Sequence, residues 1–299
     1  MKKLLIATTA LTLVAGAAAA DVTVAGSGYF GLKYDGTAGR TTTLIDRTQL
    51  DFNMSKATDS GLKFHGHIRI RENDRQSIGV TGQGIGGGSV GVTAGGLDVT
   101  VGNVSDAIDA MALYYNSEIG ICGCGGEVLN NGNFIGSSSQ GAGNSGVLVT
   151  YTMGSFTVRA SLQQPQGQVQ NAKNETAISA LYKAGALSVE GGYYDNQATG
   201  DKGYTVVAEY AIGKSNVGLA YGHSKLAASG NTVTLYGNTT MGATTLSAFV
   251  SNDSKGTNKT NYGIGAKYDL GSGAAMVGSV RKQQQNGKTY ADLGVTFKF

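Results

Sequence analysis

The stretch Leu293-Gly294-Val295-Thr296-Phe297-Lys298-Phe299 stands at the end of the sequence and alternates apolar residues with Gly, Thr and Lys. Because successive side chains of a β-strand point to opposite faces, this alternation predicts a strand with one apolar face. An exported chain that ends on such a strand with a terminal aromatic residue is typical of β-barrels of the bacterial outer membrane. We therefore expect an all-β fold, in which Phe299 contributes to barrel assembly.

The start of the sequence has the features of an export signal. Two lysines precede an apolar stretch over residues 4–16, and the alanines at 18–20 supply the small residues of a cleavage site. We expect residues 1–20 to be a cleaved signal peptide and residues 21–299 to form one outer-membrane barrel domain. The apolar stretch is too short to cross a bilayer, and no other stretch approaches the roughly 18–20 apolar residues of a transmembrane helix.

The composition favours strands and tight turns. The chain has 48 Gly but one Pro, and proline is the residue that interrupts a strand ladder. Its 15 Tyr and 8 Phe, with no Trp, are enough to form aromatic girdles at the two membrane interfaces. The 23 basic and 20 acidic residues nearly balance, which does not favour nucleic-acid binding. Composition alone also allows a secreted soluble sandwich or solenoid.

The clearest strand pattern covers residues 62–71, where apolar and basic side chains alternate. One face carries Leu62, Phe64, Ile68 and Ile70, and the other carries Lys63, His65, His67, Arg69 and Arg71. A helix would not separate these two sets. In a water-filled barrel the apolar face meets lipid and the polar face lines the lumen. The predicted export signal favours this arrangement over a soluble protein with an apolar core.

Short turns alternate with longer polar loops along the chain. The turns at 58–61, 95–96, 154–155, 184–185, 213–215, 241–242 and 271–273, and the loops at 36–42, 74–88, 103–145, 165–174, 196–201, 227–230, 254–259 and 285–287, make fifteen connections. Fifteen connections predict sixteen antiparallel strands, the last of which can pair with the first. Short turns on one side and long loops on the other are typical of outer-membrane barrels. Sixteen strands leave an aqueous lumen.

Three stretches carry a resemblance to a known family. These are Phe52-Asn53-Met54-Ser55 with Thr58-Asp59-Ser60-Gly61-Leu62-Lys63-Phe64, then Tyr262-Gly263-Ile264-Gly265-Ala266-Lys267-Tyr268-Asp269-Leu270-Gly271, and Ala291-Asp292 with the terminal strand. In them the chain resembles the general diffusion porins of purple photosynthetic α-proteobacteria. The resemblance implies a homotrimer of sixteen-stranded barrels, surrounded by outer-membrane lipid and lipopolysaccharide. It also implies a long third loop that folds into each lumen and narrows it.

Residues 103–145 form the longest stretch without strand alternation, and a loop of this length is usually functional or disordered. It matches the inward-folded loop implied by the resemblance, and it carries four acids and no Lys or Arg. The acids are Asp106, Asp109, Glu118 and Glu127. Ser105 is placed to cap a short helix, with Asp106 favourable in its first turn. The alternative is an external loop with ordinary solvated acids.

Basic residues gather in the first quarter of the chain, on the predicted lumen face. Arg47 has the parity opposite to Leu44 and Leu50, and so joins Lys63, His65, His67, Arg69 and Arg71 on that face. We expect these six residues to form a basic wall across the lumen from the acidic loop. Rings of charge of this kind set ion preference in pores. The alternative is loose polar filling of the lumen.

Cys122 and Cys124 lie within the acidic loop, separated by Gly123, and depart from the related porins. An oxidising compartment favours pairing of two thiols, although so small a ring is strained. A local disulfide, free thiols, and a metal or intermolecular pairing all remain open. The resemblance implies that loop acids can hold a divalent cation, and calcium suits carboxylates. We expect no other cofactor.

The sequence therefore predicts a water-filled channel for passive diffusion of ions and small hydrophilic solutes. His65 and His67 share a strand face at a spacing that can chelate a metal, but a polar lining role is the simpler one. No Ser or Asp is placed with a His as a hydrolase would require, so we do not expect an enzyme. The alternatives are a substrate-specific channel of the same fold or a non-channel barrel such as an adhesin.

Overall fold

A computed structural model describes residues 20–36, 42–73, 84–121, 134–135, 145–164, 173–227, 230–256, 259–282 and 287–299. The strands are β1 (Asp21–Asp35), β2 (Thr42–Ala57), β3 (Lys63–Asn73), β4 (Gly84–Ile85), β5 (Ser89–Ala94), β6 (Leu97–Gly102), β7 (Ser145–Met153), β8 (Phe156–Gln164) and β9 (Glu175–Ala184). They continue with β10 (Leu187–Asn196), β11 (Asp201–Ile212), β12 (Ser215–Ser224), β13 (Asn231–Met241), β14 (Thr244–Asp253), β15 (Thr260–Gly271), β16 (Ala274–Lys282) and β17 (Thr289–Lys298).

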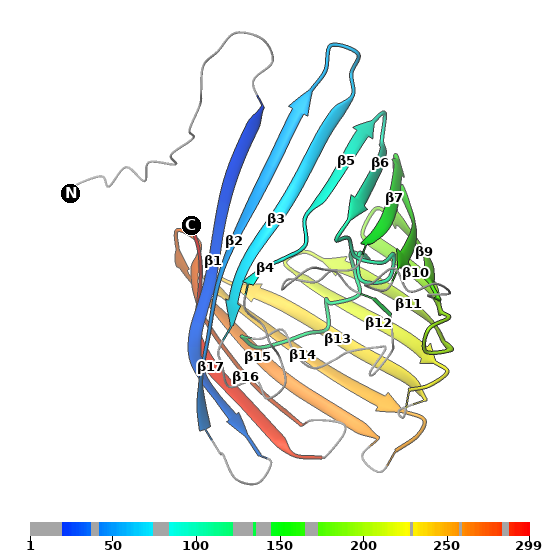
Figure 1. Ribbon diagram of the computed structural model, residues 1–299. Coiled ribbons are helices and arrows are strands. Elements are labelled where there is room, and N and C mark those ends of the chain that lie inside the picture. Colours follow the sequence, from blue (N-terminus) through cyan, green and yellow to red (C-terminus); the bar gives the residue numbers. More distant parts are fainter. Residues whose placement is uncertain are drawn as a thin grey trace, which may run out of the picture.

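Every strand pairs antiparallel with its neighbours, and β1 pairs with both β2 and β17, which closes the sheet into a barrel (Figure 1). The short strand β4 and the strand β5 both pair with β3, so they occupy one position in the ring. The closed barrel therefore has sixteen strand positions, and the predicted all-β, sixteen-stranded fold is confirmed. Within the described part of the chain, no helix is long and apolar enough to cross a membrane.

The seven predicted short turns all connect consecutive strands, as expected from their Gly and Asx content. At the β15–β16 turn, Gly271, Ser272 and Gly273 all have positive φ angles, which glycine adopts at little cost. One boundary was wrong: residues 74–88 were expected to be a loop throughout, but Gly84 and Ile85 pair with Arg71 and Ile70 of β3. The short strand β4 thus lengthens the part of the ring that β5 occupies next to β3.

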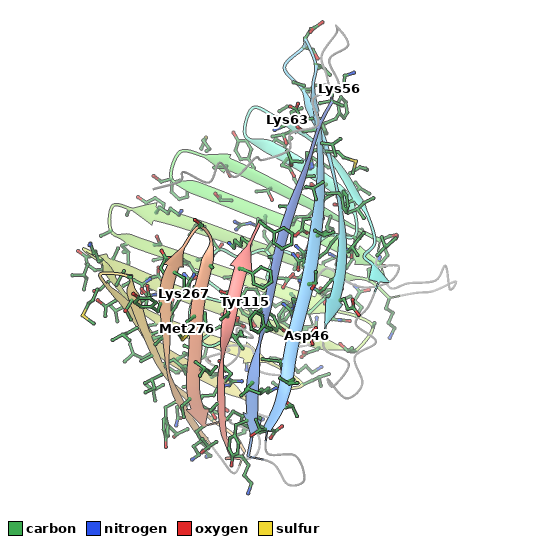
Figure 2. All side chains as sticks on the ribbon, turned by 90° about the vertical axis from the view of Figure 1, so that its left-hand side faces the viewer. Asp46, Lys56, Lys63, Tyr115, Lys267 and Met276 are labelled. Atoms are coloured by element: carbon green, nitrogen blue, oxygen red, sulfur yellow. The ribbon has the colours of Figure 1, made fainter. Side chains whose placement is uncertain are left out.

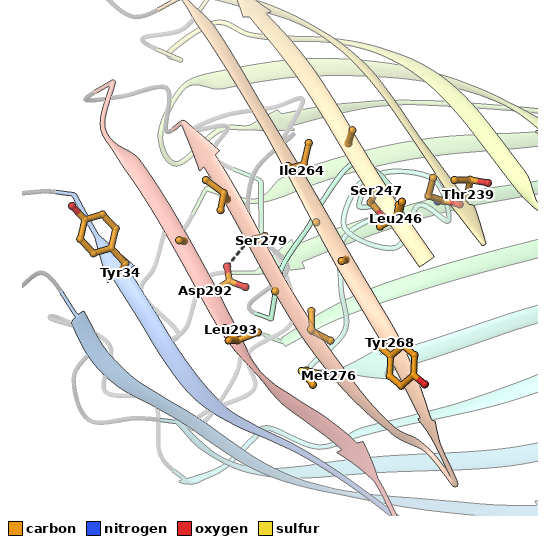
Figure 3. A pocket seen from close by; sticks show the side chains of 18 of the residues that line it. Tyr34, Thr239, Leu246, Ser247, Ile264, Tyr268, Met276, Ser279, Asp292 and Leu293 are labelled. Atoms are coloured by element: carbon orange, nitrogen blue, oxygen red, sulfur yellow. Dashed lines mark hydrogen bonds between the residues drawn. The ribbon is translucent and has the colours of Figure 1, made fainter. Parts of the chain in front are cut away.

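The outer face of the barrel is apolar and carries aromatic residues near both rims. Tyr151, Phe156, Tyr182, Tyr210 and Tyr268 lie near the short turns, and Tyr34, Tyr193, Tyr204 and Tyr262 lie near the loops; all are at least 40% exposed. Two such girdles flank the lipid-facing band of transmembrane barrels. A hollow of about 970 Å³ lies on this face, with Leu246, Ile264 and Met276 in its lining (Figure 3).

The seam between β1 and β17 is packed backbone against backbone. Gly31 pairs with Gly294, and a Cβ on Gly294 would overlap the Phe30 carbonyl oxygen and lie 2.6 Å from Ile121 Cδ1. At the end of β17, the Phe299 backbone exchanges two hydrogen bonds with Gly26, of 2.7 and 3.0 Å. The Phe299 ring covers Gly26. These contacts agree with a role for Phe299 in closure, and its role in assembly stays a prediction.

We predict that Gly294→Ala impairs folding of the barrel. The added methyl group has no space at the seam, and overpacking of this kind costs about 1–3 kcal/mol. The folded fraction is measured by the different electrophoretic mobility of heated and unheated protein. Gly191→Ala on β10 is the matched control, because a Cβ there meets its nearest atoms at 3.4 and 3.5 Å. Equal folded fractions for the two variants would contradict the tight seam.

Candidate functional site

Residues 103–121, the longer of the two described parts of the long loop, lie along the inner wall of the barrel. Its apolar side chains, including Ile108, Met111, Tyr114 and Ile119, are buried with wall residues in one hydrophobic cluster. Glycines on the wall make room for them: a Cβ at Gly192 of β10 would meet Ile108 and Met111 within 3.1 Å. The third loop therefore folds inward and is packed against the wall.

Asp106 begins a turn at residues 107–110, where a short helix capped by Ser105 was expected. Its Oδ1 accepts hydrogen bonds from the Ile108 and Asp109 N–H groups, at 2.8 and 2.6 Å, so Asp106 rather than Ser105 caps the turn. Its side chain is fully buried between loop and wall, beside the Glu175 carboxyl of β9. Burial, together with Glu175, raises the pKa of Asp106 to about 9. At neutral pH it is protonated and contributes no charge to the lumen.

Among the described residues, wall side chains accept hydrogen bonds from the loop backbone at four places. The N–H of Ala107 donates to Ser161 Oγ, at 2.9 Å. The other three acceptors are carboxylates: Leu113 N–H to Glu190 (2.8 Å), Ile121 N–H to Asp292 (2.9 Å) and Ile135 N–H to Glu175 (2.9 Å). A buried backbone N–H needs an acceptor, and a charged acceptor makes a stronger hydrogen bond than a neutral one. The wall thus anchors the described part of the loop at several separate positions.

Two of these carboxylates are paired with arginines that the sequence analysis did not single out. Arg159 donates to Glu190 at 2.8 Å, and Arg281 donates to Asp292 at 2.9 Å. Ser279 also donates to Asp292, at 2.6 Å, as Figure 3 shows. These residues all occupy lumen-facing positions in the alternation of their strands. That alternation is the sequence signal that could have identified them. Sequence alone did not show which lumen positions the loop would cover.

The surface of the loop that faces the lumen carries acids. Asp109 and Glu118 are partly exposed, and Tyr115 is 41% exposed and donates a hydrogen bond to Asp109. Desolvation of the Tyr115 hydroxyl and the neighbouring Asp109 raise the pKa of that hydroxyl, so it remains a donor. Asn116 donates to Glu209 of β11 at 3.0 Å, which fixes this segment to the wall.

Basic side chains of β2 and β3 form a separate hydrogen-bonded network on the inner wall. Asp51 accepts from Arg69 Nε at 2.7 Å and lies 2.9 Å from His67 Nε2. Arg71 donates two hydrogen bonds to Gln49 Oε1, at 2.9 and 2.7 Å. The Arg47 guanidinium lies 4.9 Å from the centre of the Tyr29 ring. Asp51 and Gln49 thus hold the basic groups in defined positions.

The profile of the Gram-negative porin family matches residues 7–288, most of the chain. The chain belongs to the Gram-negative porin family. It is 30% identical to a porin of Fuscovulum blasticum over 296 residues, covering 93% of this chain and all of the relative. It is 29% identical to a porin of Rhodobacter capsulatus over 314 residues, with the same coverage of both chains.

Solved porin structures agree with the fold. A substitution variant of the Rhodopseudomonas blastica porin superposes with a TM-score of 0.85 at 29% identity, covering 93% of this chain and all of that one. A triple mutant of the same porin gives the same values. The expected resemblance to porins of purple photosynthetic bacteria is therefore confirmed, as is the outer-membrane β-barrel class.

The six predicted basic residues of this porin do not lie at one level. Lys63 is at the start of β3, near the tip of the β2–β3 hairpin (Figure 2), and Arg71 is near the end of the same strand. Eight residues of strand separate them by about 26 Å. His65 lies 2.7 Å from Asp98 of β6, outside the Asp51 network. Only Arg47, His67, Arg69 and Arg71 are brought together with Asp51 and Gln49.

Several predicted residues of the porin loop lie outside the described residues. These are Cys122, Cys124 and Glu127, so the state of the thiols stays open. Among the side chains that the structure describes, no group of three or more His, Cys, Asp or Glu could hold a metal ion. Calcium binding by the loop acids stays a prediction.

We predict that the docking of the porin loop weakens as the pH rises from about 4 to 9. The docked form keeps the Asp106 proton, whereas a released loop would lose it above about pH 4. The stabilisation is therefore complete below pH 4 and is lost as the pH rises through the folded pKa of about 9. Hydrogen–deuterium exchange of residues 107–116 measures the docking.

Asp106→Asn is the matched variant for this prediction. Asparagine keeps the cap acceptor and has no proton to lose, so its loop should stay protected at pH 9–10 while the parent loop loses protection. At pH 6 the two proteins should exchange at similar rates. Parallel pH profiles for the two proteins would show that Asp106 does not control docking.

Proposed function

We propose that this porin is a passive, water-filled channel for ions and small hydrophilic solutes, narrowed by its third loop. The observation that carries the proposal is the attachment of the middle of the acidic loop to the wall opposite the basic strands. Asn116 is bound to β11, and β11 and β12 lie eight positions from β2 and β3 in a ring of sixteen. The part of the loop around Asn116 and the basic network therefore face each other across the lumen.

This arrangement supports a transverse electric field at the narrowest level. Asp109 and Glu118 supply its negative side, because Asp106 is buried and neutral. Arg47, Arg69 and Arg71 supply its positive side, and arginine stays charged at any physiological pH. Low-dielectric walls strengthen such a field. A polar solute in the gap aligns its dipole and exchanges part of its hydration for contacts on both sides.

The cellular context of the proposal follows from the family. We propose export through a cleaved signal at residues 1–20, insertion into the outer membrane among lipid and lipopolysaccharide, and assembly as a homotrimer. The apolar outer face with its two aromatic girdles supports the membrane location. Under this proposal the chain conducts solutes and catalyses no reaction.

Single-channel recording in planar bilayers tests the proposal, with the reversal potential measured under a salt gradient. We predict that the double variant Arg69→Ser, Arg71→Ser shifts ion preference several-fold toward cations, because it removes two positive charges and leaves Asp51 without its arginine. The double variant Asp109→Asn, Glu118→Gln should shift preference toward anions.

A charge outside the proposed gap provides the control. Lys214 lies in the β11–β12 turn, at the rim, and Lys214→Gln should leave the reversal potential unchanged. If Lys214→Gln shifted the reversal potential as much, per charge removed, as the two double variants do, then total charge and not the loop–wall gap would set selectivity. Folded protein that conducts no current would contradict the channel itself and favour a non-channel barrel.

A further inference from the structure

A second hollow, of about 560 Å³, lies inside the barrel on the side of the short turns. Ser27, Tyr29, Arg47, Lys267, Asp269 and Lys298 are among the residues that line it. Next to it, Tyr29 packs against the cluster of Ile45, Ile121, Ala275 and Val277, which contains the last described residue of the loop before its gap. The hollow therefore lies next to the attached loop, between it and the turn rim.

Strand register explains why these residues, distant in sequence, share one patch of wall. Tyr29 pairs with Arg47 on one side and with Thr296 on the other, and Ser27 pairs with Lys298. Lys267 pairs with Thr245 and Val277. Residues paired across a sheet point to the same face, and Arg47 and Val277 face the lumen. The patch is thus continuous over strands β2, β1, β17, β16 and β15.

The lining of the hollow is cationic. Three positive side chains, Arg47, Lys267 and Lys298, border it against one carboxylate, Asp269. Asp269 accepts the Gly271 N–H through Oδ1 at 2.9 Å, in the β15–β16 turn. Within the described residues neither lysine ammonium has a hydrogen-bond or ion-pair partner. Both ammonium groups are exposed and keep their donors for a solute.

Arg47 adds a third, positioned charge to these two point charges. Its guanidinium lies over the Tyr29 ring, 4.9 Å from the ring centre, which restricts its orientation. Its positive charge attracts carboxylate or phosphate oxygens. A volume of this size is within the range of small-molecule sites. The combination matches a small oxyanion that carries two negative charges.

We propose that this hollow is a weak binding site for small oxyanions with two negative charges, such as dicarboxylates or phosphate. The inference rests on the proposed channel function and adds a solute class to it. An anion that passes the loop meets Arg47 at the narrowed level and then Lys267 and Lys298, on the side that short turns assign to the periplasm. The site would raise the local concentration of such anions at the inner mouth of the pore.

The test measures how succinate and inorganic phosphate change the potassium chloride current through single channels of the full-length protein. Saturable reduction of the current is expected with both probes. Lys267→Gln and Lys298→Gln should each weaken the apparent affinity by about two- to fivefold, the range for one partly exposed charge pair. If only one of the two probes reduced the current in a saturable way, the site would be assigned to that oxyanion.

Lys56→Gln is the matched control, because Lys56 lies on the β2–β3 hairpin, away from the hollow, and Figure 2 shows it near the hairpin tip. It should leave the apparent affinity unchanged. Equal weakening by Lys56→Gln would overturn the site in favour of overall charge. Weakening by Arg69→Ser, Arg71→Ser with no effect of the two lysine variants would also overturn it, because binding would then lie at the basic wall.

Isothermal titration of the detergent-solubilised protein with succinate separates this proposal from the channel itself. Normal potassium chloride conductance without saturable binding would overturn the site and leave the channel function intact. Absent conductance with lysine-dependent binding would overturn the channel function and retain the site. Binding that neither lysine variant changes would overturn the site in either case.

Discussion

Nine residue pairs between β1 and β17, from Ser27 with Lys298 to Asp35 with Tyr290, close the sheet. In a bilayer, backbone N–H and C=O groups have no water to bind, so a sheet can cross only if it has no open edge. The glycine pair Gly31 and Gly294 lets the two backbones approach at this seam. Closure then creates the two surfaces on which function depends, an apolar one toward lipid and a polar one around water.

Charged residues inside the barrel have two different roles. Glu175, Glu190 and Asp292 accept hydrogen bonds from the loop backbone and are almost fully buried, so they position the loop and are shielded from the lumen. Asp109 and Glu118, on the loop, remain accessible to solutes. Counting acids and bases therefore says little about selectivity. Burial decides which of them a passing ion meets.

Much of the architecture could be predicted from local patterns in the sequence. Turn chemistry located the seven short turns, and period-two alternation placed Arg47, Arg69 and Arg71 on the lumen face. The same alternation did not show that Lys63 and His65 lie at other levels, because it specifies the face of a strand and not the height of a residue in the barrel. It also missed Arg159 and Arg281, since their importance comes from the loop that covers their partners.

The sequence by itself determined the closed sixteen-stranded barrel, because side-chain period and turn residues act over a few neighbouring positions. Only the tertiary structure decided the state of Asp106, which reads as a loop acid but is buried beside Glu175, about 70 residues away in sequence. It alone brought Arg47, Lys267 and Lys298 to one hollow. The physical reason is that desolvation and field strength depend on which groups, distant in sequence, are close in space. Closure of the barrel determines which groups are close.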